Sequence, residues 1–379
     1  MTDIRNDDPG ARSTSNGDGQ REPRAGDSKA GDPKARASEG AARSQVKIVI
    51  PADHSMVSLL GSGDDLLHVI EREFDADIHV RGNEITATGT PAETALITAL
   101  FDELVELLRK GTDLTADAVE RTAAMLRAER GVRPADVLTV GILSARGRTI
   151  RPKTLNQKRY ADAIDQHTIV FAIGPAGTGK TYLAMAKAVK ALQAKEVNRI
   201  ILTRPAVEAG ERLGFLPGTL YEKIDPYLRP LYDALHDMLD PDSIPRLMTA
   251  GTIEIAPLAY MRGRTLNDSF IILDEAQNTS AEQMKMFLTR LGFGSRVVVT
   301  GDVTQVDLPA GQVSGLRVVQ DILDGIEDIH FARLTSHDVV RHRLVGKIVD
   351  AYERYDAQAQ AHQLDRSGQG ARPARRKGS

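Results

Sequence analysis

One stretch near the middle of the chain constrains its fold more than any other. Residues 168–173 have the length, apolarity and β-branched content of a buried strand. Residues 174–181 fill every position of the pattern G-x-x-x-x-G-K-[ST], and a helical pattern follows with Leu183, Ala186 and Val189 on one face. Strand, glycine-rich loop and helix are the context in which this pattern binds phosphates. The chain is therefore predicted to bind a nucleoside triphosphate.

The residue types in this loop follow from the chemistry of phosphate binding. Unpaired backbone N–H groups and the dipole at a helix N-terminus favour negative charge. Gly177 and Gly179 let the backbone turn and approach the phosphates without a Cβ atom. Lys180 is expected to reach the β- and γ-phosphates, and the Thr181 hydroxyl to ligate Mg²⁺. The predicted nucleotide-binding residues of the loop are Gly174, Pro175, Ala176, Gly177, Thr178, Gly179, Lys180 and Thr181.

Composition excludes several classes of function. The 379 residues are enough for about two or three domains. A formal net charge of −3 rules out a globally basic nucleic-acid binder but leaves room for a local basic patch. The absence of Cys excludes disulfides and Cys-ligated zinc. Without a secretory signal pattern or a run of about 20 apolar residues, a cytoplasmic protein that does not span a membrane is expected.

Three segments are predicted ahead of the domain that carries the phosphate loop. Residues 1–45 have almost no large apolar side chains and are expected to form a disordered tail, because they cannot bury enough surface to offset the cost of ordering. Residues 46–112 are predicted to form a small α+β domain, with helices on one face of a sheet. Residues 113–153 are predicted to be a helical linker, with an Arg-rich connector after its helix.

The order of elements in the small domain resembles a KH-type RNA-binding module. In order, we expect a strand at 46–50, a turn at 59–63, a helix at 64–74, paired strands at 78–80 and 84–87, and a helix at 92–108. A KH loop uses a Gly-x-x-Gly backbone clamp on nucleotide phosphates. Here the Gly-Ser-Gly of residues 61–63 is followed by Asp64 and Asp65, whose carboxylates would repel a phosphate. RNA contact and a protein-interaction or assembly role therefore both stay open.

Apolar strands recur after the phosphate loop, at residues 200–202, 253–255, 270–273, 297–299 and 329–331. Near-continuous apolar strands separated by helical patterns indicate a parallel sheet covered on both faces. For the domain that carries the phosphate loop we therefore predict an α/β fold, with a parallel sheet flanked by helices. Residues 356–379 are expected to form a disordered basic tail.

Two carboxylates follow one of these strands. Asp274 and Glu275 come directly after residues 270–273, where a carboxylate is costly unless it meets a cation or hydrogen-bond donors. Beside a phosphate loop that cation is Mg²⁺, so Asp274 joins Thr181 as a predicted metal ligand, acting through water. Glu275 is the candidate base that orients or deprotonates the attacking water. An ordinary acidic helix cap at Asp274 is the alternative.

A further polar stretch, residues 300–309, follows the next strand along the chain. At the carboxyl end of a strand it would lie in the crevice where parallel sheets bind ligands. The amide of Gln305 can donate to a γ-phosphate and accept from water, so Gln305 is a candidate catalytic residue. A plain Asp/Gly turn is the alternative.

Taken together, these motifs resemble the first motor domain of superfamily 1 helicases. That resemblance is carried by Asn156-Gln157, residues 174–181, Thr203-Arg204-Pro205, residues 274–278 and residues 301–305. Further stretches narrow it to the PhoH-like (phosphate-starvation-inducible) ATPases, namely residues 204–211, 213–218, 260–265 and 340–342. The resemblance covers residues 154–355 and implies for them an α/β fold of the P-loop NTPase (RecA-like) type. The KH-like module ahead of them also fits that family.

The resemblance implies roles for further residues. Gln157 would read adenine, which makes ATP the expected nucleotide. Arg204 and residues 210–218 would lie where related helicases contact single-stranded nucleic acid, and Arg262 and Arg264 are further candidates for that contact. An arginine finger, the catalytic arginine that completes a neighbouring subunit's ATP site, is expected at Arg262, Arg264 or, first of all, Arg341. Each arginine could instead be an ordinary surface or ion-pair residue.

The function expected from these features is Mg²⁺-dependent ATP hydrolysis coupled to binding or remodelling of single-stranded RNA. Because the sequence carries one motor domain where helicases have two, subunits of a homo-oligomeric ring, such as a hexamer, are expected to complete each other's sites. A separate ribonuclease is a further candidate partner. The alternatives are a nucleotide-gated scaffold and a P-loop kinase, although the sequence shows no Arg-rich lid segment.

Overall fold

The computed structural model describes residues 43–128, 133–205, 220–309 and 311–340, together with residues 345, 348 and 351. The expected tail at 1–45 thus falls almost wholly outside the described residues, and strand β1 already begins at Ser44. Residues 210–218, Arg341 and the expected tail at 356–379 also lie outside them. Within the described part, no helix is long and apolar enough to cross a membrane.

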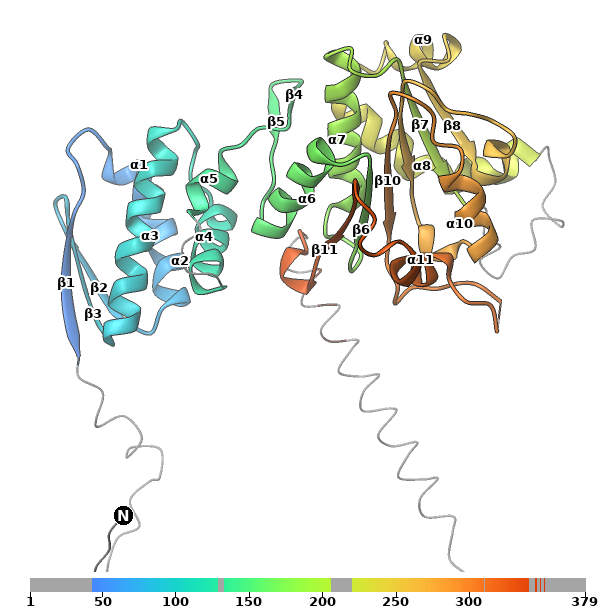
Figure 1. Ribbon diagram of the computed structural model, residues 1–379. Helices are drawn as coiled ribbons and strands as arrows, with labels where there is room; N and C mark the ends of the chain where they lie inside the picture. The colour runs from blue at the N-terminus through green and yellow to red at the C-terminus, as the bar shows by residue number, and fades with distance from the viewer. Residues whose placement is uncertain are drawn as a thin grey trace, which may run out of the picture. The chain divides into compact units, whose positions relative to one another are not determined.

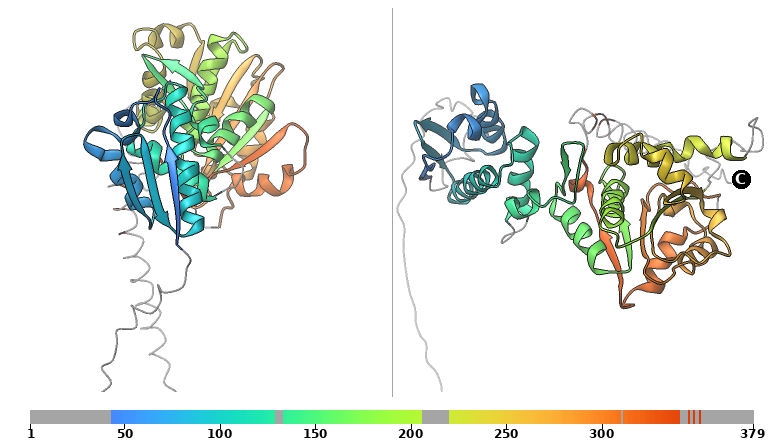
Figure 2. Two further views of the ribbon diagram at one scale, coloured as in Figure 1. Left: turned by 90° about the vertical axis from the view of Figure 1, so that its left-hand side faces the viewer. Right: turned by 90° about the horizontal axis from the view of Figure 1, so that it is seen from above.

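A small antiparallel sheet forms the first part of the described chain. Its strands, in the order β1-β3-β2, are β1 (Ser44–Val49), β3 (Glu84–Gly89) and β2 (Asp77–Arg81). The helices of this part are α1 (Met56–Leu60), α2 (Asp65–Glu73), α3 (Pro91–Arg109), α4 (Ala116–Ala128) and α5 (Pro134–Leu138). Helix α3 packs against β1 and β3, α4 packs against α2 and α3, and α5 packs against α3 and α4 (Figures 1 and 2). One hydrophobic cluster, drawn from residues 48–138, fills this part.

Local sequence explains the longest helix of this part. Pro91 occupies the first turn of α3, and the Thr90 hydroxyl accepts a hydrogen bond from the Glu93 backbone N–H at 3.3 Å. The predicted strand pair at 78–80 and 84–87 is confirmed as the antiparallel hairpin of β2 and β3. The predicted turn at 59–63 is wrong at its start, because Leu59 and Leu60 are buried at the end of α1. The KH resemblance and the domain boundaries stay predictions.

The predicted Arg-rich connector holds more regular structure than expected. Besides α5 it contains a two-stranded hairpin, β4 (Leu143–Ala145) and β5 (Arg148–Ile150). The turn between these strands places Arg146 and Gly147 at φ 51° and 74°. Three-residue strands are too short to show the alternation by which a strand is recognised in sequence.

The later part of the described chain is built on a six-stranded sheet, whose strands lie in the order β11-β6-β10-β9-β7-β8 (Figure 1). Its strands are β6 (Ile169–Ile173), β7 (Arg199–Arg204), β8 (Ile253–Pro257), β9 (Ser269–Leu273), β10 (Arg296–Gly301) and β11 (Ile329–Arg333). Every neighbouring pair is parallel. The predicted α/β fold with a parallel sheet is confirmed.

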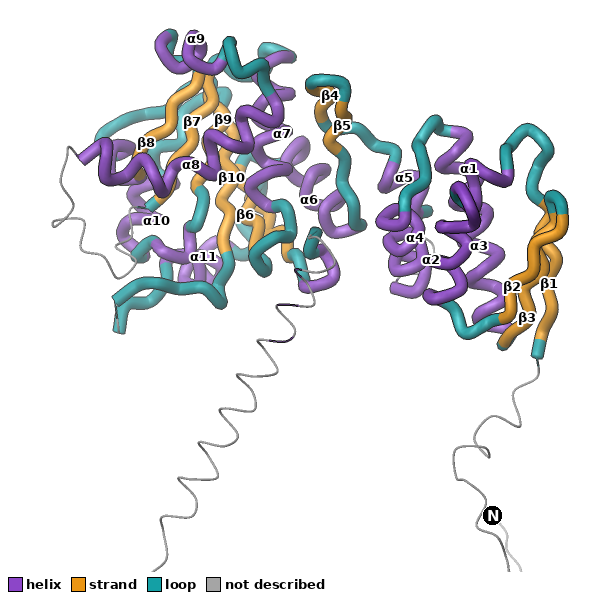
Figure 3. The backbone as a smooth tube through the Cα atoms, turned by 180° about the vertical axis from the view of Figure 1, so that it is seen from behind, coloured by secondary structure: helices purple, strands orange, loops and turns teal. Residues whose placement is uncertain are grey.

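Helices cover both faces of this sheet (Figure 3). They are α6 (Leu155–Gln166), α7 (Lys180–Gln193), α8 (Leu220–Met238), α9 (Ile244–Thr249), α10 (Ala281–Leu288) and α11 (Gly315–Leu323). Alternate side chains of β6 point to opposite faces. Val170 and Ala172 pack in the cluster of α6, α7 and α8, whereas Phe171 and Ile173 pack in the cluster of α10 and α11. Because both faces are buried, the strands are apolar throughout.

The parallel arrangement brings the carboxyl ends of three strands together at one end of the sheet, which is called the sheet edge below. Ile173 of β6 lies opposite Gly301 of β10, and Leu273 of β9 lies opposite Val299. The Gly174 backbone N–H donates to the Gly301 carbonyl at 3.2 Å. The segments that follow these strands therefore meet at the edge where parallel sheets bind ligands.

Candidate functional site

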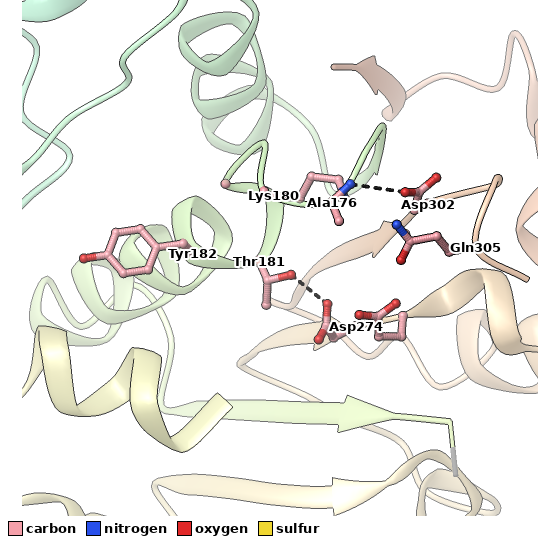
Figure 4. A pocket seen from close by; sticks show the side chains of 11 residues that line it. Ala176, Lys180, Thr181, Tyr182, Asp274, Asp302 and Gln305 are labelled. Carbon is pink, nitrogen blue, oxygen red and sulfur yellow. Dashed lines mark hydrogen bonds between the residues drawn. The ribbon is translucent and has the colours of Figure 1, made fainter. Parts of the chain in front are cut away.

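A cavity of about 240 Å³ opens at this edge of the sheet (Figure 4). Its lining residues are Ala176, Gly177, Gly179, Lys180, Thr181, Tyr182, Asp274, Glu275, Gly301, Asp302 and Gln305. They come from the segments that follow β6, β9 and β10, apart from Gly301, which is the last residue of β10. The structure thus brings together the phosphate loop, both predicted carboxylates and Gln305, which are far apart in the sequence.

The glycines of the phosphate loop serve two different needs. Gly177 and Gly179 have φ values of 82° and 79°, in the left-handed region that favours glycine. Gly174 is constrained by space instead, since a Cβ atom there would clash with the backbone carbonyl of Leu334 beyond β11. The loop is thereby seated against the neighbouring strand, and α7 begins directly at Lys180.

Lys180 points back into the phosphate loop. Its buried ammonium donates to the backbone carbonyl oxygens of Gly174 at 2.7 Å and Pro175 at 2.8 Å. These two acceptors are neutral, so an anionic phosphate oxygen would be a stronger acceptor for the same group. The Tyr160 hydroxyl donates to the Lys180 carbonyl at 3.0 Å. Burial, and then the charge of Asp274, raises the pKa of Tyr160 well above its usual range, so this donor stays protonated.

Asp274 is held by two hydroxyl groups. Thr181 Oγ1 donates to Asp274 Oδ1 at 2.6 Å (Figure 4), and Thr300 Oγ1 donates to the same oxygen at 2.8 Å. The carboxylate is buried, so these donors offset part of its desolvation. Thr300 was not among the predicted site residues, although a hydroxyl directly after three valines in a strand is a signal that could have revealed it.

This donor set fits a magnesium ion. Mg²⁺ prefers oxygen ligands and is held by one or two carboxylates together with phosphates and water. The Thr181 hydroxyl and the Asp274 carboxylate supply protein oxygens of this kind. Among the described residues, no group of three or more His, Cys, Asp or Glu side chains could hold a metal without such added ligands. The residues therefore suit a metal ion that arrives with a phosphate ligand.

Glu275 has an unusual backbone and two side-chain partners. Its φ of 53° lies in the left-handed region, which costs a non-glycine residue energy. One carboxylate oxygen lies 3.2 Å from Arg204 Nη2. The other accepts a hydrogen bond from Gln277 Nε2 at 2.6 Å. The candidate base is therefore fixed beside the cavity between two donors.

Asp302 ties the segment after β10 to the phosphate loop. Its Oδ2 accepts from the Ala176 backbone N–H at 3.1 Å (Figure 4), and its Oδ1 accepts from both the backbone N–H and the hydroxyl of Thr304. The exposed Gln305 follows in the same turn and lines the cavity. The Asp/Gly turn considered as the alternative is present, and it places Gln305 in the cavity lining, while a contact of Gln305 with a γ-phosphate stays a prediction.

Gln157 lies behind the phosphate loop and does not line the cavity. It is buried, and its Nε2 donates to the carbonyls of Thr178 at 3.0 Å and Asp338 at 3.3 Å. Its Oε1 accepts from the Lys153 backbone N–H at 2.7 Å. Both amide hydrogens are therefore in use, and reading adenine, which stays a prediction, would require one of them to change partner.

The Asp338 contact belongs to a network that the sequence did not reveal. Asp338 ends the short helix η6 (Ser336–Asp338), and its carboxylate accepts from Thr154 Oγ1 at 2.6 Å and Asn156 Nδ2 at 3.0 Å. Two residues later, the Val340 backbone N–H donates to the Gly177 carbonyl at 2.9 Å. The segment after β11 is thus bonded both to the start of α6 and to the phosphate loop.

Arg262 and Arg264 do not line the cavity. Arg264 donates to both carboxylate oxygens of Glu254, at 2.6 and 2.7 Å. This pair lowers the pKa of Glu254 and raises the pKa of Arg264. Arg262 is exposed after the short helix η4 (Leu258–Met261). The ion-pair alternative thus describes Arg264, while Arg341 lies outside the described residues.

Comparison with known proteins places the chain in a family. The family described as "PhoH: PhoH-like protein" matches residues 149–353. The "PhoH-like protein" of Mycobacterium tuberculosis (strain ATCC 25618 / H37Rv) is 67% identical over 322 residues, which cover 85% of this chain and 91% of that protein. The "PhoH-like protein" of Bacillus subtilis (strain 168) is 51% identical over 299 residues, or 79% of this chain and 94% of that protein.

Two more distant similarities complete the comparison. "Protein PhoH" of Escherichia coli (strain K12) is 48% identical over 198 residues, which cover 52% of this chain and 56% of that protein. A solved structure, "Crystal structure of Pif1 helicase from Candida albicans", has 16% sequence identity and a TM-score of 0.28, with coverage of 52% of this chain and 42% of that chain. Because the family matches residues 149–353 and two relatives are matched over 91% and 94% of their own length, this chain belongs to the PhoH-like protein family.

Proposed function

We propose that this chain is an Mg²⁺-dependent ATPase whose turnover is coupled to binding or remodelling of single-stranded RNA. One observation carries the proposal. The Thr181 hydroxyl at the start of α7 and the Asp274 carboxylate at the end of β9 are 2.6 Å apart, in a cavity that Lys180 and Glu275 also line. A phosphate held by the loop would therefore lie within reach of metal-binding oxygens and of a general base.

Each residue of the cavity has a part in the proposed reaction. The loop N–H groups and Lys180 would hold the β- and γ-phosphates, and Thr181 and Asp274 would hold Mg²⁺, which neutralises phosphate charge. Glu275 would accept a proton from the attacking water as its oxygen bonds to the γ-phosphorus and the bond to ADP breaks. Gln305 would contact the γ-phosphate and the water. Adenine recognition by Gln157 belongs to the same proposal.

The RNA and assembly parts of the proposal rest on the family resemblance. Arg204 stands at the end of β7, at the same sheet edge as the cavity. A ring of subunits would supply Arg341 to a neighbouring site, and Arg262 remains a candidate for RNA contact because it is exposed. A separate ribonuclease is the proposed partner, and the cytoplasm the proposed location.

The direct test measures phosphate release with and without single-stranded RNA. We expect Mg²⁺-dependent release that RNA stimulates. A Glu275→Gln variant should retain ATP binding and lose turnover by about 10²–10⁴-fold, because only proton transfer is removed. Equal loss of binding and turnover would refute Glu275 as the base.

Two other outcomes would support the alternatives. Slow release that RNA leaves unchanged would indicate a nucleotide-gated scaffold. ADP formation with a phosphorylated acceptor and no free phosphate would indicate a P-loop kinase.

A further inference from the structure

The contacts of Glu275 carry an inference about how its activity is controlled. Both carboxylate oxygens are engaged, one by the guanidinium of Arg204 at 3.2 Å and the other by the amide of Gln277 at 2.6 Å. Each oxygen already has a donor beside it, so an attacking water must compete with these contacts for a place on the carboxylate. In this arrangement the proposed base is present but restrained.

The two partners of Glu275 differ in their freedom to move. Gln277 is 1% exposed, and its Oε1 accepts from the Asp302 backbone N–H at 3.0 Å, so the amide is locked into the sheet edge. Arg204 is the last residue of β7, and its side chain is 22% exposed. Gln277 is therefore a fixed support, whereas the guanidinium of Arg204 can be reached by a ligand from solvent.

We infer that the Arg204–Glu275 contact is a latch, meaning that Arg204 restrains the Glu275 carboxylate. The phosphate backbone of a single-stranded polynucleotide releases the latch by binding the guanidinium. A guanidinium matches phosphate oxygens in geometry and charge as well as it matches a carboxylate. When a backbone phosphate takes the guanidinium, Oε1 of Glu275 loses this contact and can accept a hydrogen bond from the attacking water. Arg204 thus acts as a positioning residue, and RNA binding becomes a signal for hydrolysis. The inference rests on the proposed function.

If the latch exists, an RNA phosphate and the Glu275 carboxylate compete for the guanidinium of Arg204. A double-mutant cycle on RNA affinity measures this competition without any turnover. Binding of a fluorescent single-stranded poly(U) oligomer would be compared for wild type, Glu275→Gln, Arg204→Ala and the double variant. We expect Glu275→Gln to bind roughly two- to fivefold more tightly than wild type, the effect of freeing one partly exposed ion-pair partner. In the Arg204→Ala background the same substitution should have a smaller effect. Equal effects in both backgrounds would overturn the latch.

Turnover gives a second readout. Without RNA, Arg204→Ala should release phosphate roughly two- to fivefold faster than wild type at the same ATP affinity, and RNA should add no further stimulation. Arg204→Lys, which keeps the charge but loses the planar fork, should fall between the two. Arg246→Ala, an exposed site on α9, is the matched control and should behave as wild type. An RNA-free rate of Arg204→Ala at or below that of wild type would overturn the latch.

The two experiments separate this inference from the proposed function. If wild type releases no phosphate that depends on Glu275, the proposed ATPase activity fails, whatever the binding cycle shows. If wild type hydrolyses ATP while the binding cycle shows no coupling between Arg204 and Glu275, the ATPase proposal stands and the latch alone fails.

Discussion

Two buried threonines beside Asp274 differ in their hydrogen bonding. Both Thr203 and Thr300 are fully buried, and the Thr203 carbonyl accepts the Asp274 backbone N–H at 2.9 Å. The Thr300 hydroxyl donates to the Asp274 carboxylate, whereas Thr203 Oγ1 has no hydrogen-bond partner among the described residues. An unpaired buried hydroxyl costs free energy, and a paired one contributes to stability.

Valine substitutions at these two positions should therefore have different effects on stability. Thr300→Val should lower the free energy of unfolding by about 1–3 kcal/mol, because the buried Asp274 loses a donor. Thr203→Val should leave the free energy of unfolding unchanged or raise it, because an unpaired hydroxyl is replaced by a methyl group. Urea unfolding of both variants and wild type checks this. A shift of both midpoints in the same direction would contradict the hydrogen-bond assignment.

Lys180→Ala should act on binding rather than on the chemical step. Loss of the ammonium removes the cation that the loop offers to a phosphate, so we expect ATP affinity to fall by more than about tenfold. Equilibrium titration with a fluorescent ATP analogue measures the affinity, and circular dichroism checks that the fold is kept. Lys190→Ala, an exposed position on the same helix, is the control and should bind as wild type. Unchanged ATP affinity in Lys180→Ala would remove the phosphate loop from the mechanism.

At the scale of elements, the strands of the parallel sheet were predictable and their order was not. Each strand appears in the sequence as an apolar run because both of its faces are buried. Local pattern carries no information on neighbours, and β10 lies between β6 and β9 although it follows both in the chain. The short helices α1 and α5 and the β4–β5 hairpin were missed because none spans enough residues to show a periodicity.

Some residues of the candidate site were likewise predictable from the sequence and others were not. The phosphate loop and the pair Asp274 and Glu275 were predicted because their residue types recur at a spacing that phosphate and metal chemistry demand. Their supports, Gln277 and Thr300, were missed. A buried amide or hydroxyl is useful only through a partner that folding brings to it, as Gln277 shows by bonding to the Asp302 backbone. A single sequence can show an unusual polar residue, such as Thr300 after three valines, but it does not show the partner to which that residue bonds.

The contact between the phosphate loop and β11 leads to a prediction about Gly174. A Cβ atom at this position would clash with the backbone carbonyl of Leu334, whose N–H donates to the Ile173 carbonyl at 2.8 Å. Backbone atoms held in a sheet cannot move aside as a side chain can, so Gly174→Ala should destabilise the fold by about 1–3 kcal/mol. Thermal unfolding measures the effect.

Gly141→Ala is the matched control for that experiment. Its Cβ atom would meet only the methyl group of Thr149, which is exposed and free to shift. We expect a change in stability within about 0.5 kcal/mol. If Gly174→Ala were as stable as this control, the close contact between Gly174 and the backbone of Leu334, just after β11, would be contradicted.

At the scale of the whole molecule, the proposed arginine finger Arg341 could act on the ATP site of its own chain or on that of a neighbouring subunit. Val340 donates its backbone N–H to the Gly177 carbonyl of the same chain, so the segment that leads to Arg341 starts from its own phosphate loop. Two hypotheses can thus be tested: Arg341 completes the ATP site of its own chain, or it completes the site of a neighbouring subunit. The proposed ring requires the second, because each site would then combine residues of two subunits.

Mixing two inactive variants distinguishes these hypotheses. Arg341→Ala keeps the base but lacks the finger, and Glu275→Gln keeps the finger but lacks the base. In randomly mixed rings with equal amounts of each variant, about a quarter of the sites should pair an intact base with an intact neighbouring finger, so about a quarter of wild-type phosphate release should return. Each variant alone is the control. A mixture no more active than the two variants measured separately, at a concentration where light scattering shows mixed oligomers, would place the finger and the base in the same chain.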